Sequence, residues 1–167
     1  MNQVSILSAG RHTTGLIRTA VALVLAASLQ ACQSAESPTF RSVVDTKTLM
    51  DAVIERQANI VWESVGTFVS TEGTEDRRPQ NDEEWKRVRD AAITITESSN
   101  LLLAPPHVQG GDWPERVNAL IDQGQRMIDA ATRKDAQAVF DVGADLYEAC
   151  VACHTNYMPG VKELYMR

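Results

Sequence analysis

Hydrophobic residues recur at steps of three and four along most of the chain beyond residue 45, and this spacing predicts amphipathic helices. The first helix is expected over about residues 46–66, with Asp45 or Thr46 as its N-cap and Gly66 as its end. Its apolar positions are Leu49, Met50, Val53, Ile54, Ile60, Val61 and Val65. The polar segment 71–76 that follows predicts a mobile connection.

Capping patterns predict where the next two helices begin. Asn81 followed by Glu84 opens a second helix, which ends before Pro105–Pro106. Its stripe is Trp85, Val88, Ala92, Ile95, Ser99 and Leu102. Asp112 followed by Glu115 repeats the capping pattern and opens a third helix. The stripe of that helix is Val117, Leu120, Ile121, Gly124, Met127, Ile128 and Ala131.

A fourth helix is expected from Asp135, its N-cap, to the pair 159–160. Its stripe is Ala136, Val139, Phe140, Gly143, Leu146, Tyr147, Cys150 and His154. Four such helices without a convincing alternating strand predict an all-α fold, an antiparallel up-down-up-down four-helix bundle. This topology gathers a set of apolar residues at one end, around the last turns of the fourth helix. They are Met50, Leu101, Leu102, Leu103, Trp113 and Val117.

The beginning of the chain has the pattern of an export signal. Arg11 and Arg18 precede or flank an apolar run at 19–29, which is too short to span a bilayer as a helix. The sequence Leu29-Gln30-Ala31-Cys32 resembles a bacterial lipobox, in which Cys32 becomes the lipidated first residue after cleavage. Ordinary cleavage to a free periplasmic protein is the alternative, because glutamine is an unusual residue in such a box.

These features predict four segments. Residues 1–31 are the signal peptide, 32–44 the lipidated N-terminus and tether, 45–160 the four-helix domain, and 161–167 a C-terminal tail. Removing the signal peptide leaves 136 residues, the size of one domain, and takes the net charge from −6 to −8. Such an acidic chain does not suit nucleic acid, and its charge either keeps it soluble or steers it toward a basic redox partner.

The chemistry is expected at Cys150-Val151-Ala152-Cys153-His154, in the last helix. Two cysteines three residues apart with a histidine after the second form the attachment pattern of c-type haem, in which both thiols bond to the porphyrin and the imidazole binds iron. Three residues make about one helical turn, so both sulfurs face the same way and His154 reaches the metal. The sequence therefore predicts one haem c per chain.

The same cysteines could instead form a disulfide, a thioredoxin-like redox pair or half of a zinc site. Zinc would need further ligands, and the remaining candidates are Cys32, His12 in the signal peptide, and His107. A thioredoxin-like pair follows a strand and opens a helix, whereas this pair closes one.

A c-type haem motif at the end of the last helix of a four-helix bundle resembles the class II cytochromes c, the group that contains cytochrome c-prime and its low-spin, Met-ligated relatives. The resemblance spans about residues 45–157. It implies that Cys150 and Cys153 attach the haem, that His154 is an axial ligand, and that Tyr157 is the aromatic residue often found three positions after the histidine. The basic residue that typically follows this aromatic in cytochrome c-prime is Met158 here.

The second axial ligand decides between two functions. Met50 is expected at the haem end of the first helix and resembles the position of the methionine ligand in the low-spin relatives. Met127 lies fourteen residues along its helix from Trp113, near the other end, and Met158 lies on the same side of the ring as His154. His107 is either a further ligand candidate or an exposed loop residue. Leu102, Trp113 and Tyr157 are expected to line the pocket.

The predicted function is an exported electron carrier with His154 and Met50 as axial ligands; the alternative is a five-coordinate binder of small gases such as nitric oxide. No second cofactor motif, paired carboxylates or nucleophile suggests an enzyme. The expected partners are redox proteins and, through the lipid, a bacterial membrane on its periplasmic side. A homodimer is left open.

Overall fold

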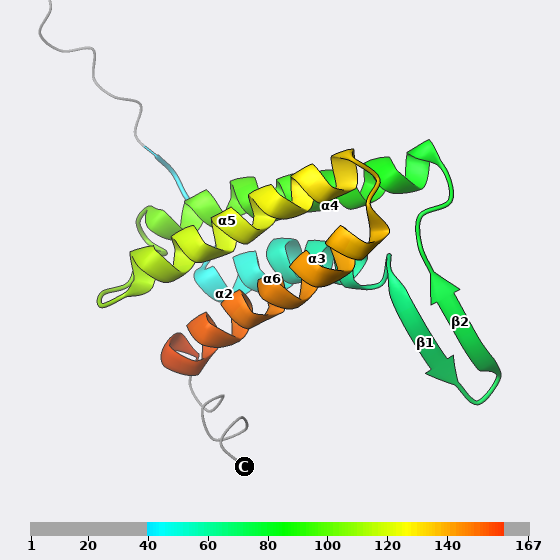
Figure 1. Ribbon diagram of the computed structural model, residues 1–167. Coiled ribbons are helices and arrows are strands. Elements are labelled where there is room, and N and C mark those ends of the chain that lie inside the picture. Colours follow the sequence, from blue (N-terminus) through cyan, green and yellow to red (C-terminus); the bar gives the residue numbers. More distant parts are fainter. Residues whose placement is uncertain (1–39, 159–167) are drawn as a thin grey trace, which may run out of the picture. The chain divides into compact units, whose positions relative to one another are not determined.

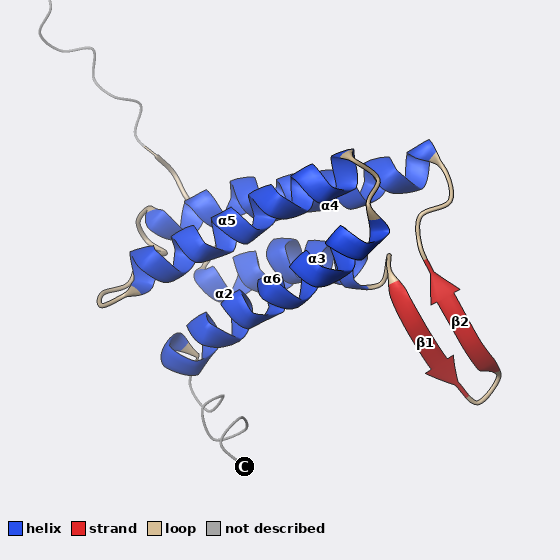
Figure 2. Ribbon diagram, in the orientation of Figure 1, coloured by secondary structure: helices blue, strands red, loops and turns tan. Residues whose placement is uncertain are grey.

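Four helical segments and one small two-stranded sheet make up residues 40–158, the part of the chain that the structure, a computed structural model, describes (Figure 1). The predicted signal peptide, Cys32 and the predicted tail at 161–167 lie outside these residues. From Arg41 onward the chain forms one unit, and helix dominates it (Figure 2). None of the helices in the described range is long and apolar enough to cross a bilayer.

The first helical segment is continuous but not uniform. It consists of α2 (Thr46–Leu49), a π-helical turn η1 (Met50–Ile54) and α3 (Glu55–Trp62). Asp45 is the N-cap, as predicted, and its side chain accepts a hydrogen bond from the backbone N–H three residues later. The helix ends at Trp62, four residues earlier than predicted, because Gly66 already belongs to a strand.

A β-hairpin replaces the mobile connection that the sequence predicted. Strand β1 (Gly66–Ser70) pairs antiparallel with β2 (Gly73–Arg77) across a two-residue turn. The prediction missed it because β2 is polar and exposed throughout, so it has no alternating pattern. Gly73 has φ +139° and so adopts a backbone conformation that side chains disfavour. The guanidinium carbon of Arg77 in β2 lies 4.1 Å from the centroid of the Phe68 ring in β1, and this cation–π contact stabilises the pairing of the two strands.

The second helical segment begins as predicted. In α4 (Asp82–Ser99) the Asn81 side chain accepts a hydrogen bond from the Glu84 backbone N–H, and the Glu84 carboxylate accepts one in return from the Asn81 amide. A 3-10 turn, η2 (Asn100–Leu103), extends this helix to within two residues of Pro105, so it ends before the proline pair as predicted.

The predicted capping box of the third helix is wrong. In α5 (Trp113–Thr132) Asp112 occupies the N-cap position but its side chain makes no capping hydrogen bond. Its carboxylate instead forms an ion pair with Arg116, one turn further on, so it is not free to cap the helix. Glu115 therefore has no capping partner there.

The last helix is α6 (Ala136–Tyr157), and Asp135 caps it as predicted by accepting a hydrogen bond from Ala138 N.

The helices pack in sequence order. Helix α4 lies along α5, α5 along α6, and α3 contacts both α4 and α6 (Figure 1). The hairpin projects from the end of this assembly.

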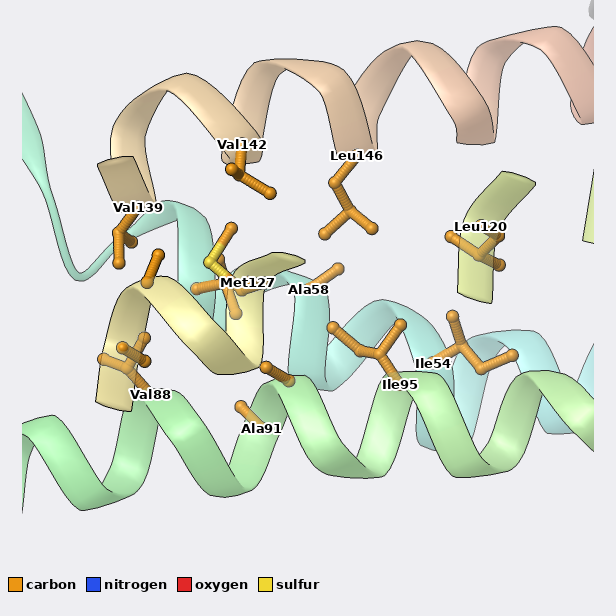
Figure 3. Close-up of a cluster of buried hydrophobic side chains, with 14 of the residues drawn as sticks. Ile54, Ala58, Val88, Ala91, Ile95, Leu120, Met127, Val139, Val142 and Leu146 are labelled. Atoms are coloured by element: carbon orange, nitrogen blue, oxygen red, sulfur yellow. The ribbon is translucent and has the colours of Figure 1, made fainter. Parts of the chain in front are cut away.

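One hydrophobic core joins all the helices, and it includes most of the predicted apolar positions. Figure 3 shows the buried side chain of Met127 from α5 among side chains from α3, α4 and the first half of α6. Two predicted core residues of α6, Phe140 and Tyr147, are instead exposed. They lie on one stripe of α6 beside Trp62, and this stripe borders a mostly apolar groove of about 250 Å³ between α3 and α6.

Helices α4 and α5 approach each other closely at Gly124. A Cβ atom added there would lie 2.2 Å from Thr96 Oγ1 and 3.4 Å from Thr96 Cα. Thr96 is buried and its hydroxyl donates to the Ala92 carbonyl, so this side chain is held in place. The glycine is therefore required by the distance between the two helices.

Candidate functional site

The Cys-x-x-Cys-His motif occupies the last two turns of α6. Cys153 is buried, while Cys150 and His154 are partly buried. The spacing of three and four residues places Cys150 on the same side of the helix as Cys153 and His154. The helix ends soon after the motif, where the backbone N–H of Met158 donates to the His154 carbonyl.

Both cysteines are free thiols in the structure. Burial, and to a smaller extent the neighbouring Cys153, raise the pKa of Cys150 to about 11. Burial also raises the pKa of Cys153, against the opposing influence of Arg116. Both groups are therefore protonated at neutral pH. Thiol–disulfide exchange needs a thiolate, so this environment gives no support to a thioredoxin-like pair.

The two histidines of the described chain differ in what their rings contact. His107 is 1% exposed, and its Nε2 lies 2.8 Å from Ser42 Oγ while its Nδ1 lies 3.0 Å from Thr46 Oγ1. The interpretation of His107 as an exposed loop residue is therefore wrong, and both its nitrogens are already engaged. For His154, no residue within 40–158 makes a hydrogen bond or ion pair to the ring.

The start of α5 holds the motif in position. Arg116 Nη1 donates to the carbonyl oxygen of Ala152, which lies between the two cysteines, at 2.7 Å. The same guanidinium pairs with Asp112, with Nη2 2.6 Å and Nε 2.8 Å from Oδ2. Sequence analysis did not single out Arg116. The Asp112–Arg116 spacing of four residues on a helix was the signal that could have found the pair.

Tyr157 extends this contact by one turn. Its hydroxyl lies 2.7 Å from Asp112 Oδ1 and 2.8 Å from the Gly110 carbonyl oxygen, both of which are acceptors. Its ring meets the Trp113 ring edge to face, with centroids 4.8 Å apart. Trp113 is buried, and its Nε1 donates to the Leu102 carbonyl at 2.7 Å. The structure thus brings together the three predicted pocket residues Leu102, Trp113 and Tyr157.

A scan against protein-family models, a search of curated proteins and a search of solved structures each found no match to this chain.

Met50 lies in the π-helical turn η1, is partly buried and packs against the core. The contacts of His107 place the beginning of α2 beside the α4–α5 connection, and Trp113 and Tyr157 place the end of α6 there as well. The first helix therefore starts at the end of the molecule that carries the motif, and Met50 stands at the beginning of its second turn. The other methionine of the core, Met127, packs beside Val139 and Val142 in the first half of α6 (Figure 3).

Within residues 40–158 no three or more His, Cys, Asp or Glu side chains are grouped so that they could hold a metal ion by themselves. Haem iron differs from such a centre, because the porphyrin supplies four of its ligands and the protein only one or two. The donors present fit that requirement. Two neutral thiols on one side of a helix suit covalent attachment, and one imidazole suits axial ligation.

Proposed function

We propose that this chain is an exported c-type cytochrome that carries electrons between proteins, with one haem c bound through Cys150 and Cys153. The imidazole of His154 would bind the haem iron. The observation that carries the proposal is the arrangement on α6, where two free thiols and an imidazole stand at the spacing of the haem motif. Haem iron supplies a one-electron redox change, and the protein supplies its ligands and surroundings.

The fold proposed for this function is the antiparallel four-helix bundle of the class II cytochromes c, with the hairpin as an addition between the first two helices. The order in which the helices pack supports it, since each long helix lies along the next and α3 contacts α6. Contacts at the motif end, from Leu102 through Trp113 to Tyr157, support the alternating direction of α4, α5 and α6.

Met50 is the proposed second axial ligand. The π-helical turn that begins at Met50 supports this role, because π turns in α-helices are rare and occur frequently at functional sites. A thioether ligand holds iron low-spin in both oxidation states and raises its potential relative to a second imidazole. The buried side chains of Leu102 and Trp113 would exclude water from that end of the core.

An absorption spectrum of the reduced protein with and without carbon monoxide tests the function. The wild type is expected to be low-spin and to bind carbon monoxide poorly. Met50→Leu should keep the fold, because the volumes are similar, while it turns the iron high-spin and opens it to carbon monoxide. Met158→Leu, which changes an exposed methionine, is the matched control and should behave as wild type. A wild type that is already high-spin and binds carbon monoxide readily would favour the gas-binding alternative.

The proposed location is the periplasmic side of a bacterial membrane, with a lipid on Cys32. This residue lies outside the described part of the chain, and the proposal depends on the lone thiol that follows the signal peptide. Labelled palmitate should enter the wild type but not Cys32→Ala. If both proteins are equally soluble after export, the protein is a free periplasmic one.

The mature net charge of −8 supports steering toward basic redox partners. Such steering weakens as ionic strength rises, because salt screens exposed charges.

A further inference from the structure

Arg116 and Asp112 form a charge pair directly against the haem motif. Arg116 donates to the backbone between the two cysteines; its side chain is 25% exposed and that of Asp112 is 49% exposed. A different ion pair, Arg126 of α5 with Asp145 of α6, is 54% and 50% exposed, and neither of its residues contacts the motif through a hydrogen bond. Partly buried charges are screened less by water and salt than exposed ones. Of these two ion pairs, Arg116–Asp112 is the one that contacts the motif, and its guanidinium is the less exposed cation.

The pair is asymmetric with respect to the motif. The guanidinium contacts the Ala152 carbonyl, whereas the carboxylate faces the Tyr157 hydroxyl on its other oxygen. The ion pair with Arg116, followed by the hydrogen bond from Tyr157, holds the pKa of Asp112 below its usual range. Both Asp112 and Arg116 are therefore charged at neutral pH. The positive guanidinium of Arg116 lies against the turn of α6 between Cys150 and Cys153, here called the attachment turn.

We propose that Arg116 and Asp112 set the reduction potential of the haem bound at this motif, in addition to fixing the attachment turn of α6 against α5. The inference rests on the proposed function and adds to it two positioning residues. Reduction adds one negative charge to the site. A nearby positive charge stabilises the reduced form and raises the potential, while a nearby negative charge lowers it.

The two charges predict shifts of opposite sign. Arg116→Gln removes the positive charge and leaves the Asp112 carboxylate unpaired, so the potential should fall. Asp112→Asn leaves the guanidinium unpaired against the motif, so the potential should rise. A purely structural role makes a different prediction, because both variants break the same ion pair. It would change stability in both and move the potentials in the same direction or not at all.

The experiment is an equilibrium redox titration of the haem-loaded proteins, purified after export, at one pH and one ionic strength. Each shift is expected to be of the order of a tenfold change in the ratio of reduced to oxidised protein at a given electrode potential, about 59 mV for one electron. Arg116→Lys keeps the charge and should restore most of the wild-type potential. Arg126→Gln breaks the distant ion pair and should leave the potential unchanged.

The inference is overturned if Arg116→Gln and Asp112→Asn shift the potential in the same direction, or if neither differs from Arg126→Gln. Thermal unfolding of the same samples reports the structural role separately. A wild type that carries no haem would instead remove the proposed function itself. The two failures are therefore distinguishable.

Discussion

Replacing Cys150 and Cys153 together by alanine is expected to leave no haem bound to the polypeptide. The wild type, matured by the c-type assembly apparatus, should retain haem through acid–acetone extraction and give a haem-stained band on a denaturing gel. The double variant should lose both signals, because no thiol of the motif remains to form the two bonds to the porphyrin. Each single variant keeps one thiol and should show weaker attachment.

The free energy of unfolding of the double alanine variant should also be lower than that of the wild type, because the variant has lost its haem. A ligand that binds the folded state stabilises it by mass action, and the loss of a group of haem size removes buried contact area worth several kcal/mol. Cys32→Ala is the matched control, since it removes the third cysteine of the chain but none of the motif. It should retain the full haem signal. Haem lost from the wild type on extraction would contradict the assignment of a c-type cytochrome.

Gly124→Ala is expected to destabilise the fold by about 1–3 kcal/mol, the usual range for overpacking a core. The added methyl group would meet Thr96 at 2.2 Å, so α4 and α5 must separate or Thr96 must leave the hydrogen bond it donates to Ala92. Alanine in place of glycine normally stabilises a helix by about 1 kcal/mol. A loss of stability in Gly124→Ala would therefore come from the close approach of α4 and α5. Urea unfolding monitored by circular dichroism measures the change.

A matched control comes from Gly143, which is also buried in a helix. A Cβ there would lie 3.5 Å from Trp62 Cδ1, an ordinary contact distance, so Gly143→Ala should be neutral or stabilising by up to about 1 kcal/mol. Thr96→Ala combined with Gly124→Ala should recover part of the loss, because the closest clashing atom is then absent. If Gly124→Ala and Gly143→Ala changed stability equally, the distance between α4 and α5 would not require a glycine at position 124.

The sequence predicted the helices well because their signals are local. Asn81 and Asp135 cap their helices as expected, since a cap needs only a side chain and a backbone N–H three residues away. The hairpin was missed because it has no such local signal. Its second strand is exposed on both faces and carries no periodic pattern that a local analysis could detect.

At the site, local reasoning found the motif but not what holds it. Helix direction placed Leu102 and Trp113 at the motif end, and the family resemblance added Tyr157; the contacts among the three show that they lie together. The partners of His107 are 65 and 61 residues away in the chain, so neither its burial nor its two hydrogen bonds could be predicted from neighbours. Arg116 likewise contacts Ala152 across 36 residues.

The two hydrogen bonds of His107 also fix where the first described residues lie on the helical unit. They hold Ser42 and Thr46 beside the α4–α5 connection, which is the end that carries the Cys-x-x-Cys-His motif. A lipid on Cys32 would be separated from Ser42 by ten residues, about 35 Å when fully extended. Such an anchor would hold the motif end near the bilayer and limit how far the protein could travel, so electrons would be exchanged with partners embedded in, or docked on, the same membrane.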